Sequence, residues 1–203
     1  MATNWPGKAV ARTANRNRSF LRLFEGAVDD AWEVRGTLRA AFKQDKPIYI
    51  RMGKKGEPVI HKEVPPDFAI GKAITVQDGE DVCLLSSGNM LPEAIEAAHR
   101  LKEKRVSACV VSFHTVKPLD ELCLAEAFGT FKLVATIEEH TLLGGFGSAV
   151  AEWVVDKAVK PQAFLRVGTP DLFFKKSGEQ EYAREELGLT GHQIADRVLK
   201  ALG

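Results

Sequence analysis

Three features are scarce in this 203-residue chain: long apolar runs, cysteine, and an excess of charge of either sign. No segment approaches the roughly 18 consecutive apolar residues of a membrane-spanning helix, and the N-terminus lacks the apolar core of a secretory signal. We therefore expect a cytoplasmic protein without a membrane partner. The 28 basic and 27 acidic residues leave a net charge of +1, which gives no electrostatic reason to expect a nucleic-acid partner.

The three cysteines are odd in number and stand far apart, at Cys83, Cys109 and Cys123. Cys83 and Cys109 fall inside apolar strand patterns, so we expect buried, reduced thiols and no metal site. The first 28 residues show no convincing period, and arginines gather among them. This composition favours a poorly ordered, solvated tail over residues 1–29 rather than a nucleic-acid-binding arm.

A short helix-and-strand unit is predicted over residues 30–60. Asp30 is placed to cap the helix, and Glu33, three residues later, would complete a capping box. One face of this helix is apolar and consists of Val34, Leu38, Ala41 and Phe42. A strand is predicted over 48–52, and the Pro65-Pro66 pair predicts a stiff linker over residues 61–67.

From residue 68 onward, strands and helices alternate regularly. Strands are predicted over 73–76, 82–86, 108–113, 133–137 and 163–167, and helices over 92–104, 119–128, 147–158, 179–187 and 191–202. The strands that begin at 82, 108 and 133 are nearly continuous apolar runs, which fits burial on both faces. The predicted fold class of residues 68–203 is therefore α/β, a three-layer αβα domain with a mostly parallel sheet of about five strands.

Polar side chains gather at the carboxyl ends of the predicted strands, where ligands usually bind in such sheets. They include His114, Glu138, Glu139 and His140. Glu138, Glu139 and His140 could act as an acid–base cluster. They could equally form a rim that hydrogen-bonds the following glycine turn or a neighbouring subunit, and their spacing favours the rim. A small independent enzyme built around His114 and His140 is a further alternative.

Two other patterns are weaker. Ser86, His114 and Asp171 could be assembled into a nucleophilic triad, but no G-x-S-x-G elbow accompanies the serine. The segment Gly144–Gly147 precedes a helix whose first amides could hold a phosphate, yet it matches neither a dinucleotide motif nor a P-loop. A tight turn that packs the helix closely on the sheet is the favoured interpretation.

Arg51 stands at the end of a predicted strand, next to a glycine-bearing loop. A guanidinium in that place can bind a phosphate through its planar, bidentate fork, or it can form an ordinary surface salt bridge. The residue pattern alone leaves both roles of Arg51 open.

The order of motifs resembles the C-terminal part of the transketolase family of thiamine-diphosphate enzymes, whose relatives include deoxyxylulose-phosphate synthase and the β-subunits of 2-oxo-acid dehydrogenases. The resemblance covers residues 30–203 and is nearest to the separately encoded C-terminal section of a split transketolase. The matching segments are Pro47–Arg51, Ile70–Ala73, Gly88 with Pro92–Ala94, His114–Asp120, Thr136–His140, Gly144–Val150, and Arg166–Gly168 with Pro170-Asp171.

Enzymes of this family have three α/β domains. The resemblance implies that residues 68–203 are the third domain and that residues 30–60 are a remnant of the pyrimidine-binding middle domain. It matches Arg51 to the arginine that contacts the phosphate of the sugar substrate. The glutamate that activates the cofactor belongs to the middle domain, so Glu138 and Glu139 do not correspond to it. No catalytic, cofactor or metal-binding residue is therefore assigned to this chain, and thiamine diphosphate and Mg²⁺ are expected only in the complete enzyme.

The first functional hypothesis is a C-terminal section of a transketolase-type enzyme, which transfers two-carbon ketol units between sugar phosphates when complete. Its partners would be the missing N-terminal and middle domains, on the same or a separate chain, and a second copy in a homodimer. The section would be mainly structural and inactive alone. The alternatives are a stand-alone protein-interaction module and the C-terminal part of a deoxyxylulose-phosphate synthase.

Overall fold

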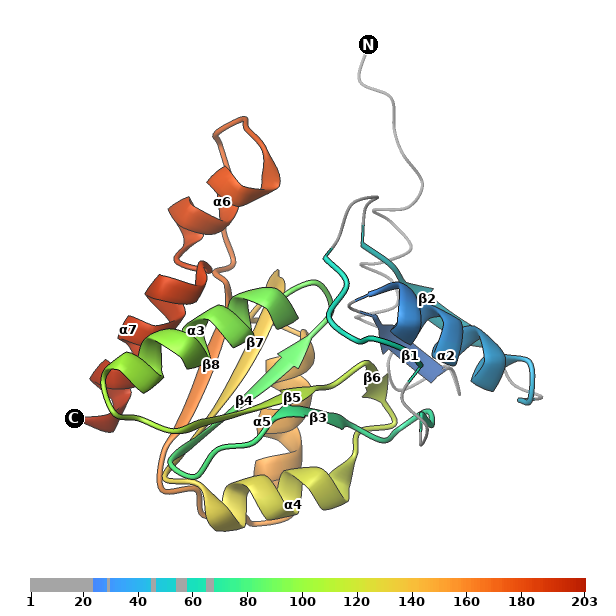
Figure 1. The fold of residues 1–203 in the computed structure, drawn as a ribbon, viewed down its shortest axis with the longest axis horizontal. Coiled ribbons are helices and arrows are strands. Elements are labelled where there is room, and N and C mark those ends of the chain that lie inside the picture. The colour runs from blue at the N-terminus through green and yellow to red at the C-terminus, as the bar shows by residue number, and fades with distance from the viewer. Residues whose placement is uncertain (1–23, 29, 45–46, 54–57, 65–67) are drawn as a thin grey trace.

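The computed structural model describes residues 24–28, 30–44, 47–53, 58–64 and 68–203 (Figure 1). The first elements are β1 (Phe24–Ala27), α2 (Ala31–Ala41) and β2 (Ile48–Arg51). They are followed by β3 (Ile74–Gln77), β4 (Val82–Ser87), α3 (Leu91–Glu103), β5 (Ala108–Ser112), β6 (Thr115–Lys117) and α4 (Glu121–Thr130). The last elements are β7 (Leu133–Thr141), α5 (Phe146–Asp156), β8 (Phe164–Thr169), α6 (Gln180–Leu187) and α7 (Gly191–Leu202).

The main sheet has five strands in the order β3-β5-β4-β7-β8. Strands β5, β4, β7 and β8 are parallel to their neighbours, and β3 adds to the edge of β5 in the antiparallel direction. Helices lie on both faces of this sheet, with α3 and α7 on one side and α4 and α5 on the other (Figure 1). The predicted three-layer αβα fold with a mostly parallel sheet is thus confirmed.

Strand β4 contributes side chains to two separate hydrophobic cores, one on each face of the sheet. Val82 and Leu84 pack with side chains of α3 and α7, whereas Cys83 and Leu85 face the opposite way and pack with side chains of α4 and α5. Successive side chains of a strand point to opposite faces, so a strand covered on both sides is apolar throughout. This is the physical reason for the continuous apolar runs in the sequence.

A second, three-stranded sheet has the order β2-β1-β6. β1 runs parallel to β2 and antiparallel to β6, which follows β5 but leaves the main sheet. The tail expected over residues 1–29 therefore includes a strand at 24–27, followed by the buried Val28. Residues 1–23 and 29 of that expected tail lie outside the described residues. Four strand residues are too few to show a period in the sequence.

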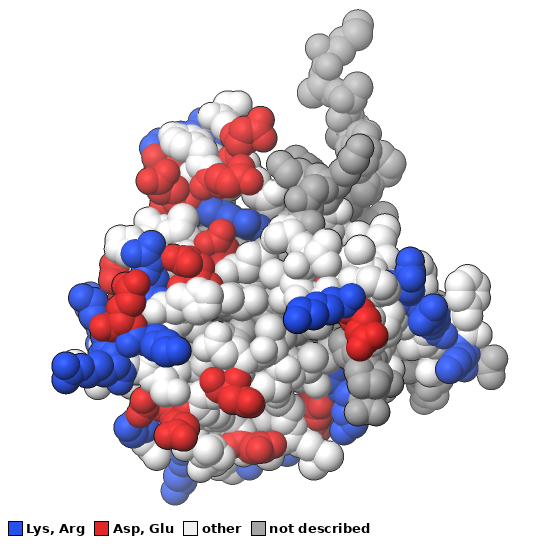
Figure 2. Space-filling model, viewed as in Figure 1, with Lys and Arg blue, Asp and Glu red and all other residues white. Residues whose placement is uncertain are grey.

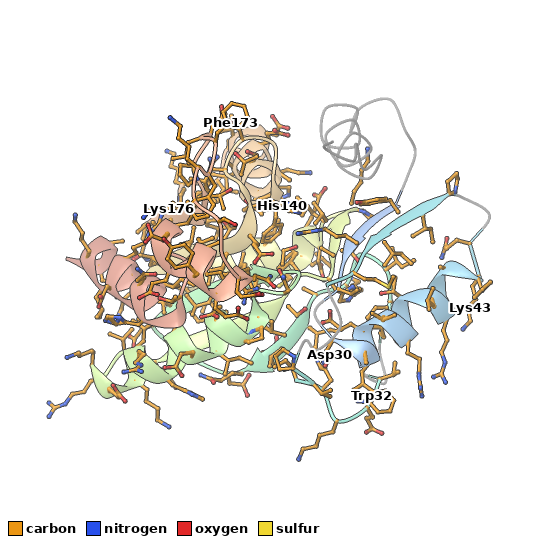
Figure 3. All side chains as sticks on the ribbon, turned by 90° about the horizontal axis from the view of Figure 1, so that it is seen from above. Asp30, Trp32, Lys43, His140, Phe173 and Lys176 are labelled. Atoms are coloured by element: carbon orange, nitrogen blue, oxygen red, sulfur yellow. The ribbon has the colours of Figure 1, made fainter. Side chains whose placement is uncertain are left out.

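Asp30, which Figure 3 labels beside α2, caps this helix as predicted. It also binds the segment that follows β2. Its Oδ1 accepts the backbone N–H groups of Trp32 and Glu33, both at 2.9 Å. Its Oδ2 accepts those of Ile60 at 3.0 Å and His61 at 2.7 Å. One buried carboxylate therefore joins the start of the helix to residues 60–61, where the expected linker begins. Residues 65–67 of that expected linker lie outside the described residues.

The apolar face predicted for α2 is not the face that the described residues bury. Leu38 is 44% exposed and Phe42 is 90% exposed, whereas the buried residues of the helix are Glu33, Gly36 and Thr37. Gly36 lies against Phe68 so closely that an added Cβ would be 2.7 Å from the ring. The Glu33 carboxylate accepts a hydrogen bond from the Ser112 hydroxyl at 2.6 Å.

On the face shown in Figure 2, Lys and Arg are interspersed with Asp and Glu, most densely over the C-terminal helices. Both signs therefore alternate there over short distances. Among the described helices, none combines the length and the apolar character that crossing a bilayer requires.

Candidate functional site

Arg51 and the last residues of β7 come together between the two sheets. β7 was predicted to end at residue 137, but it continues to Thr141, so Glu138, Glu139 and His140 belong to the strand. Arg51 ends β2, and its Nη1 lies 2.5 Å from Nε2 of His140. Its Nη2 lies 3.8 Å from Oε2 of Glu139. The structure thus brings three of the sequence-predicted site residues into one group.

Glu139 is held by three side chains from outside its own strand. Asn89 Nδ2 donates to Oε2 at 2.9 Å, while Gln180 Nε2 and Arg184 Nε donate to Oε1 at 2.7 and 2.9 Å. Burial raises the pKa of Glu139, but the hydrogen bonds from Gln180 and Asn89 and the charge of Arg184 outweigh burial, so the pKa is lowered overall. Glu139 is therefore a fixed carboxylate at neutral pH.

Arg184 is the centre of this network and is only 8% exposed. Besides Glu139, its guanidinium donates to the backbone carbonyl of Asn89 at 3.0 Å and lies 3.5 Å from Oε1 of Glu93. These contacts tie α6 to the beginning of α3 and to the end of β7. Sequence reasoning missed Arg184 and Gln180.

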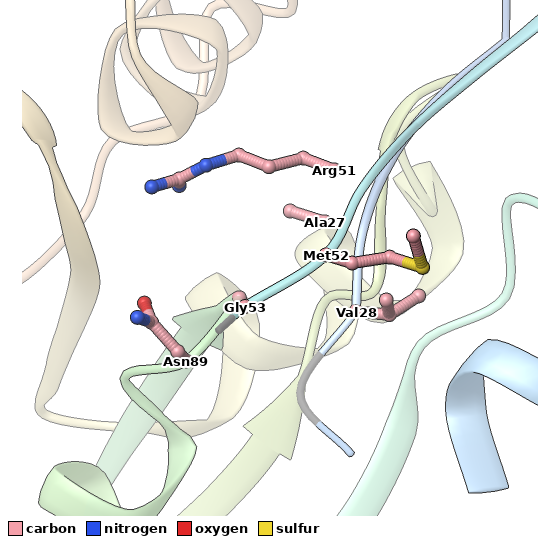
Figure 4. Close-up of a pocket in the computed structure, with 7 residues that line it drawn as sticks. Ala27, Val28, Arg51, Met52, Gly53 and Asn89 are labelled. Atoms are coloured by element: carbon pink, nitrogen blue, oxygen red, sulfur yellow. The ribbon is translucent and has the colours of Figure 1, made fainter. Parts of the chain in front are cut away.

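A small pocket lies beside Arg51, where the ends of β1 and β2 meet the loop between β4 and α3 (Figure 4). Its lining consists of Ala27, Val28, Arg51, Met52, Gly53, Gly88 and Asn89. Gly88 has a φ of +67°, and an added Cβ would lie 4.0 Å from Arg51 Nη1. The Arg51 side chain is 34% exposed. This arrangement places a permanent cation at a solvent-accessible hollow, which suits a small anion.

Glu138, although next to Glu139 in the chain, binds the start of α5 instead of the Arg51 group. It is 1% exposed, and its Oε2 and Oε1 accept the backbone N–H groups of Phe146 at 2.6 Å and Gly147 at 2.8 Å. A Cβ added at Gly145 would lie only 1.9 Å from Oε2. The first amides of α5 are therefore engaged from within the chain, in agreement with the tight-turn interpretation of the glycine segment.

His114 is buried, and the described contacts of its ring go to residues other than those of the Arg51 group. Its ring stacks on Phe68 with centroids 4.3 Å apart, and its Nδ1 is 3.0 Å from the Thr115 hydroxyl. Burial lowers the pKa of His114 to about 4, so the ring is neutral at pH 7. β4 and β7 separate β5, which precedes His114, from β8, which precedes Asp171. Within the described part of the chain, Ser86 Oγ and His114 Nε2 are both buried without a hydrogen-bond partner, and Asp171 is exposed, so the candidate triad of Ser86, His114 and Asp171 is not formed.

The cysteines are free, as expected. Cys83 and Cys109 are register neighbours on β4 and β5, and the contact with Cys109 together with burial raises the pKa of Cys83. Burial likewise raises the pKa of Cys123 to about 12. Among the described residues, no group of three or more His, Cys, Asp or Glu side chains could hold a metal ion.

Comparison with known proteins identifies the family. The family model described as "Transketolase, C-terminal domain" matches residues 71–194. A Methanocaldococcus jannaschii protein that carries the name transketolase C-terminal section is 32% identical over 177 residues, which are 87% of this chain and 54% of that protein. A 1-deoxy-D-xylulose-5-phosphate synthase of Caldanaerobacter subterraneus is 35% identical over 188 residues, which are 90% of this chain and 30% of the synthase.

A solved structure agrees with these relatives. A split-gene transketolase, described as an inactive β4 tetramer, superimposes with a TM-score of 0.77 at 31% identity and covers 89% of this chain and 57% of its own. The chain spans about half, or less, of the length of these relatives. It belongs to the transketolase family, and residues 71–194 carry the family's C-terminal domain.

Proposed function

We propose that this chain is the C-terminal section of a cytoplasmic transketolase-type enzyme, and that Arg51 holds the phosphate of the sugar substrate. In the complete enzyme a two-carbon ketol unit passes between sugar phosphates. The section contributes structure, dimerisation and the Arg51 anion site, and it is not catalytic alone. One observation carries the proposal: Arg51 is a partly exposed guanidinium at a pocket, held by His140 and facing Glu139.

The contacts of Glu139 leave the Arg51 fork available to an anion. Arg184 donates directly to Glu139 at 2.9 Å, whereas Arg51 approaches the same carboxylate only to 3.8 Å. A guanidinium carries five N–H donors, and the described contact with His140 uses one of them. Arg51 is therefore not committed to a bidentate salt bridge, and its remaining donors fit a phosphate.

The thiamine diphosphate and Mg²⁺ of complete family members do not fit the residues described in this chain. A diphosphate needs a set of free amides or cations, and the glycine-turn amides that resemble such a cradle are occupied by Glu138. The described residues also lack a cluster of metal-ligating side chains. We assign the cofactor and its metal to the N-terminal and middle domains, on the same or a separate chain.

The exposed apolar face of α2 supports the need for such a partner. Phe42 and Leu38 lie on one side of a helix whose opposite side already packs on the protein. Apolar side chains grouped on an exposed helix face commonly mark a surface that another domain covers. We expect the rest of the middle domain to cover this face. A homodimer belongs to the same proposal, and the split-gene relative is described as a tetramer of its own β chain.

Calorimetric titration of the purified chain with thiamine diphosphate and Mg²⁺ tests this division of labour. We expect no measurable binding, and no turnover of sugar phosphates by the chain alone. Ketol transfer should appear when the chain is combined with a polypeptide that carries the first two domains. In that assembly, Arg51→Gln should raise KM for sugar phosphates, with little change in assembly mass by light scattering. Turnover by the unaided chain would refute the proposal.

The relationship to deoxyxylulose-phosphate synthase supports a second candidate, the C-terminal part of such a synthase. The assembled enzyme separates the two candidates by its product. A transketolase transfers a ketol unit between sugar phosphates, whereas a synthase of the kind named forms 1-deoxy-D-xylulose 5-phosphate. A chain that stays monomeric and restores neither reaction would instead favour the stand-alone interaction module.

A further inference from the structure

Two arginines from different parts of the chain lie at the Glu139 carboxylate. Arg184, on α6, donates from Nε to Oε1 at 2.9 Å. Arg51, at the end of β2, approaches the other oxygen, Oε2, with its Nη2 only to 3.8 Å. That distance is too long for a hydrogen bond, so Glu139 is bonded to Arg184 and only faces Arg51. The arginine that lines the pocket is therefore not the one that holds the carboxylate.

The other donors to Glu139 reinforce this separation. Oε1 also accepts from Nε2 of Gln180 at 2.7 Å, and Oε2, the oxygen that faces Arg51, accepts from Nδ2 of Asn89 at 2.9 Å. A carboxylate offers about four lone-pair sites, so these three hydrogen bonds use most of its capacity. Gln180 and Arg184 stand one turn apart on α6. This helix therefore supplies two of the three donors, including the charged one.

Without its donors from α6, the Glu139 carboxylate would attract Arg51 into a direct ion pair. The attraction between the two charges increases as their distance shortens from 3.8 Å. Pairs of arginine and carboxylate are frequently bidentate and use the same N–H groups that bind a phosphate. Glu139 would then compete with the anion for the guanidinium of Arg51.

We infer that Arg184 and Gln180 are positioning residues for the anion site: they occupy the Glu139 carboxylate and thereby keep the guanidinium of Arg51 free for a phosphate. Neither residue lines the pocket beside Arg51, so both act through Glu139. The inference rests on the proposed function, because the anion is the phosphate group of the sugar. It adds that α6, which is distant from β2 in the sequence, sets the affinity of the site.

The test measures binding of inorganic phosphate to the full chain by calorimetry at neutral pH. Arg184→Gln should raise the Kd about tenfold, because Glu139 then pairs with Arg51. In a Glu139→Gln background the same change should alter the Kd by less than about twofold, since no carboxylate is left to compete. Arg100→Gln is the matched control. It removes one positive charge from an exposed pair with Glu96 on α3 and should leave the Kd unchanged.

A second variant tests the inference without removing a buried charge. Gln180→Ala deletes a donor to Oε1 from a half-buried position, and it should raise the Kd about threefold, again only while Glu139 is present. Circular dichroism first establishes that Arg184→Gln is folded. If this variant does not fold, Gln180→Ala in the two backgrounds decides alone.

The possible outcomes separate the inference from the proposed function. An equal loss of affinity in both backgrounds would show that Arg184 acts by its charge alone, and it would overturn the inference. A Kd that is unchanged in Arg184→Gln and Gln180→Ala would do the same, while Arg51-dependent binding survives. Phosphate binding that is absent in the parent chain, or unchanged in Arg51→Gln, instead overturns the proposed anion site and the inference with it.

Discussion

The carboxylate of Glu138 accepts the backbone N–H of Gly147, nine residues farther along the chain, at 2.8 Å. Its other oxygen accepts the N–H of Phe146 at 2.6 Å. A carboxylate at a helix N-terminus satisfies amides that lack an intrahelical partner, and it interacts favourably with the helix dipole. The end of β7 and the start of α5 are therefore one unit, and Glu139 and His140 project from it.

Replacement of Glu138 by glutamine should lower the free energy of unfolding by about 1–3 kcal/mol. The amide keeps one acceptor oxygen but turns an NH₂ group toward a backbone donor. Urea denaturation measures the loss. Glu152→Gln, at an exposed position of α5, is the matched control and should change stability by less than about 0.5 kcal/mol. Equal losses in the two variants would contradict the role given to Glu138.

Two glycine-to-alanine changes should act in opposite directions. A Cβ at Gly145 would lie 1.9 Å from Glu138 Oε2, so the carboxylate must move and the variant should be destabilised by about 1–3 kcal/mol. Gly129 lies in α4 with no atom within 4 Å of an added Cβ. Gly129→Ala should therefore stabilise the protein by about 0.5 kcal/mol through helix propensity. Thermal denaturation measures both changes, and a Gly145→Ala variant as stable as the parent would count against the packing described for the turn.

His114 should make the free energy of unfolding decrease as the pH falls. Its folded-state pKa is lowered from 6.5 to about 4, so the unfolded chain binds this proton more readily. The contribution of neutral His114 is fully present above about pH 6.5 and is lost as the pH falls toward 4, which amounts to about 3 kcal/mol. His114→Gln should flatten the curve of stability against pH in that window. His192→Gln should not, and a slope that is the same in both variants would show that another group titrates.

The lowered pKa of Asp30 acts in a separate, more acidic window. Burial raises its pKa, but the backbone hydrogen bonds from His61 and Glu33 and the His61 ring outweigh burial. Its contribution is therefore present above the ordinary value of 3.8 and is lost only below it. Asp30→Asn should reduce stability at neutral pH and remove the most acidic part of the transition, as followed by circular dichroism between about pH 5 and 2. A variant that keeps this acidic limb would exclude Asp30 as its origin.

Arg184 should be irreplaceable by lysine. Its guanidinium reaches Glu139, Glu93 and the Asn89 carbonyl from one planar group, and a single ammonium cannot reproduce that fork. Breaking a buried ionic network by removing one partner typically costs about 3–5 kcal/mol, so Arg184→Lys should cost a substantial part of that amount. Hydrogen exchange should rise first in α6.

Arg100→Lys is the matched control for Arg184→Lys, because Arg100 pairs with Glu96 on the exposed face of α3. Exposed pairs contribute only about 0–1 kcal/mol, so this variant should exchange and unfold like the parent. Unchanged exchange in α6 of Arg184→Lys would contradict the anchoring role of Arg184.

The elements predicted most accurately are those whose start, end and buried face are all determined by their own residues. Helix α7 was predicted over 191–202 and has those bounds, because its apolar stripe is regular and Thr190 caps it with a capping box. The end of β7 was predicted four residues early, since Glu138 looks like a turn residue. Its carboxylate is stable inside the strand only because the α5 amides bind it, and a hydrophobic period does not contain that information.

The sequence indicated several residues of the site, but it did not indicate which of them contact one another. Arg51 and His140 were each singled out, yet their contact spans 89 residues and depends on how the two sheets meet. Gln180 and Arg184 carried no signal, because a polar pair four residues apart on a short helix usually marks a solvated face. Only the fold shows that this pair is turned inward to Glu139.

Strand β6 has a consequence for any attempt to divide the protein. It comes directly after β5 of the main sheet, but it pairs with β1 of the small sheet. The chain therefore cannot be divided at residues 61–67 without separating β6 from its partner strand. In a fragment that began at residue 68, β6 would lack β1, and its backbone N–H and C=O groups would be unpaired along one edge. Such an edge strand promotes aggregation. The unit to express, graft or shuffle between relatives is therefore the small sheet together with the body.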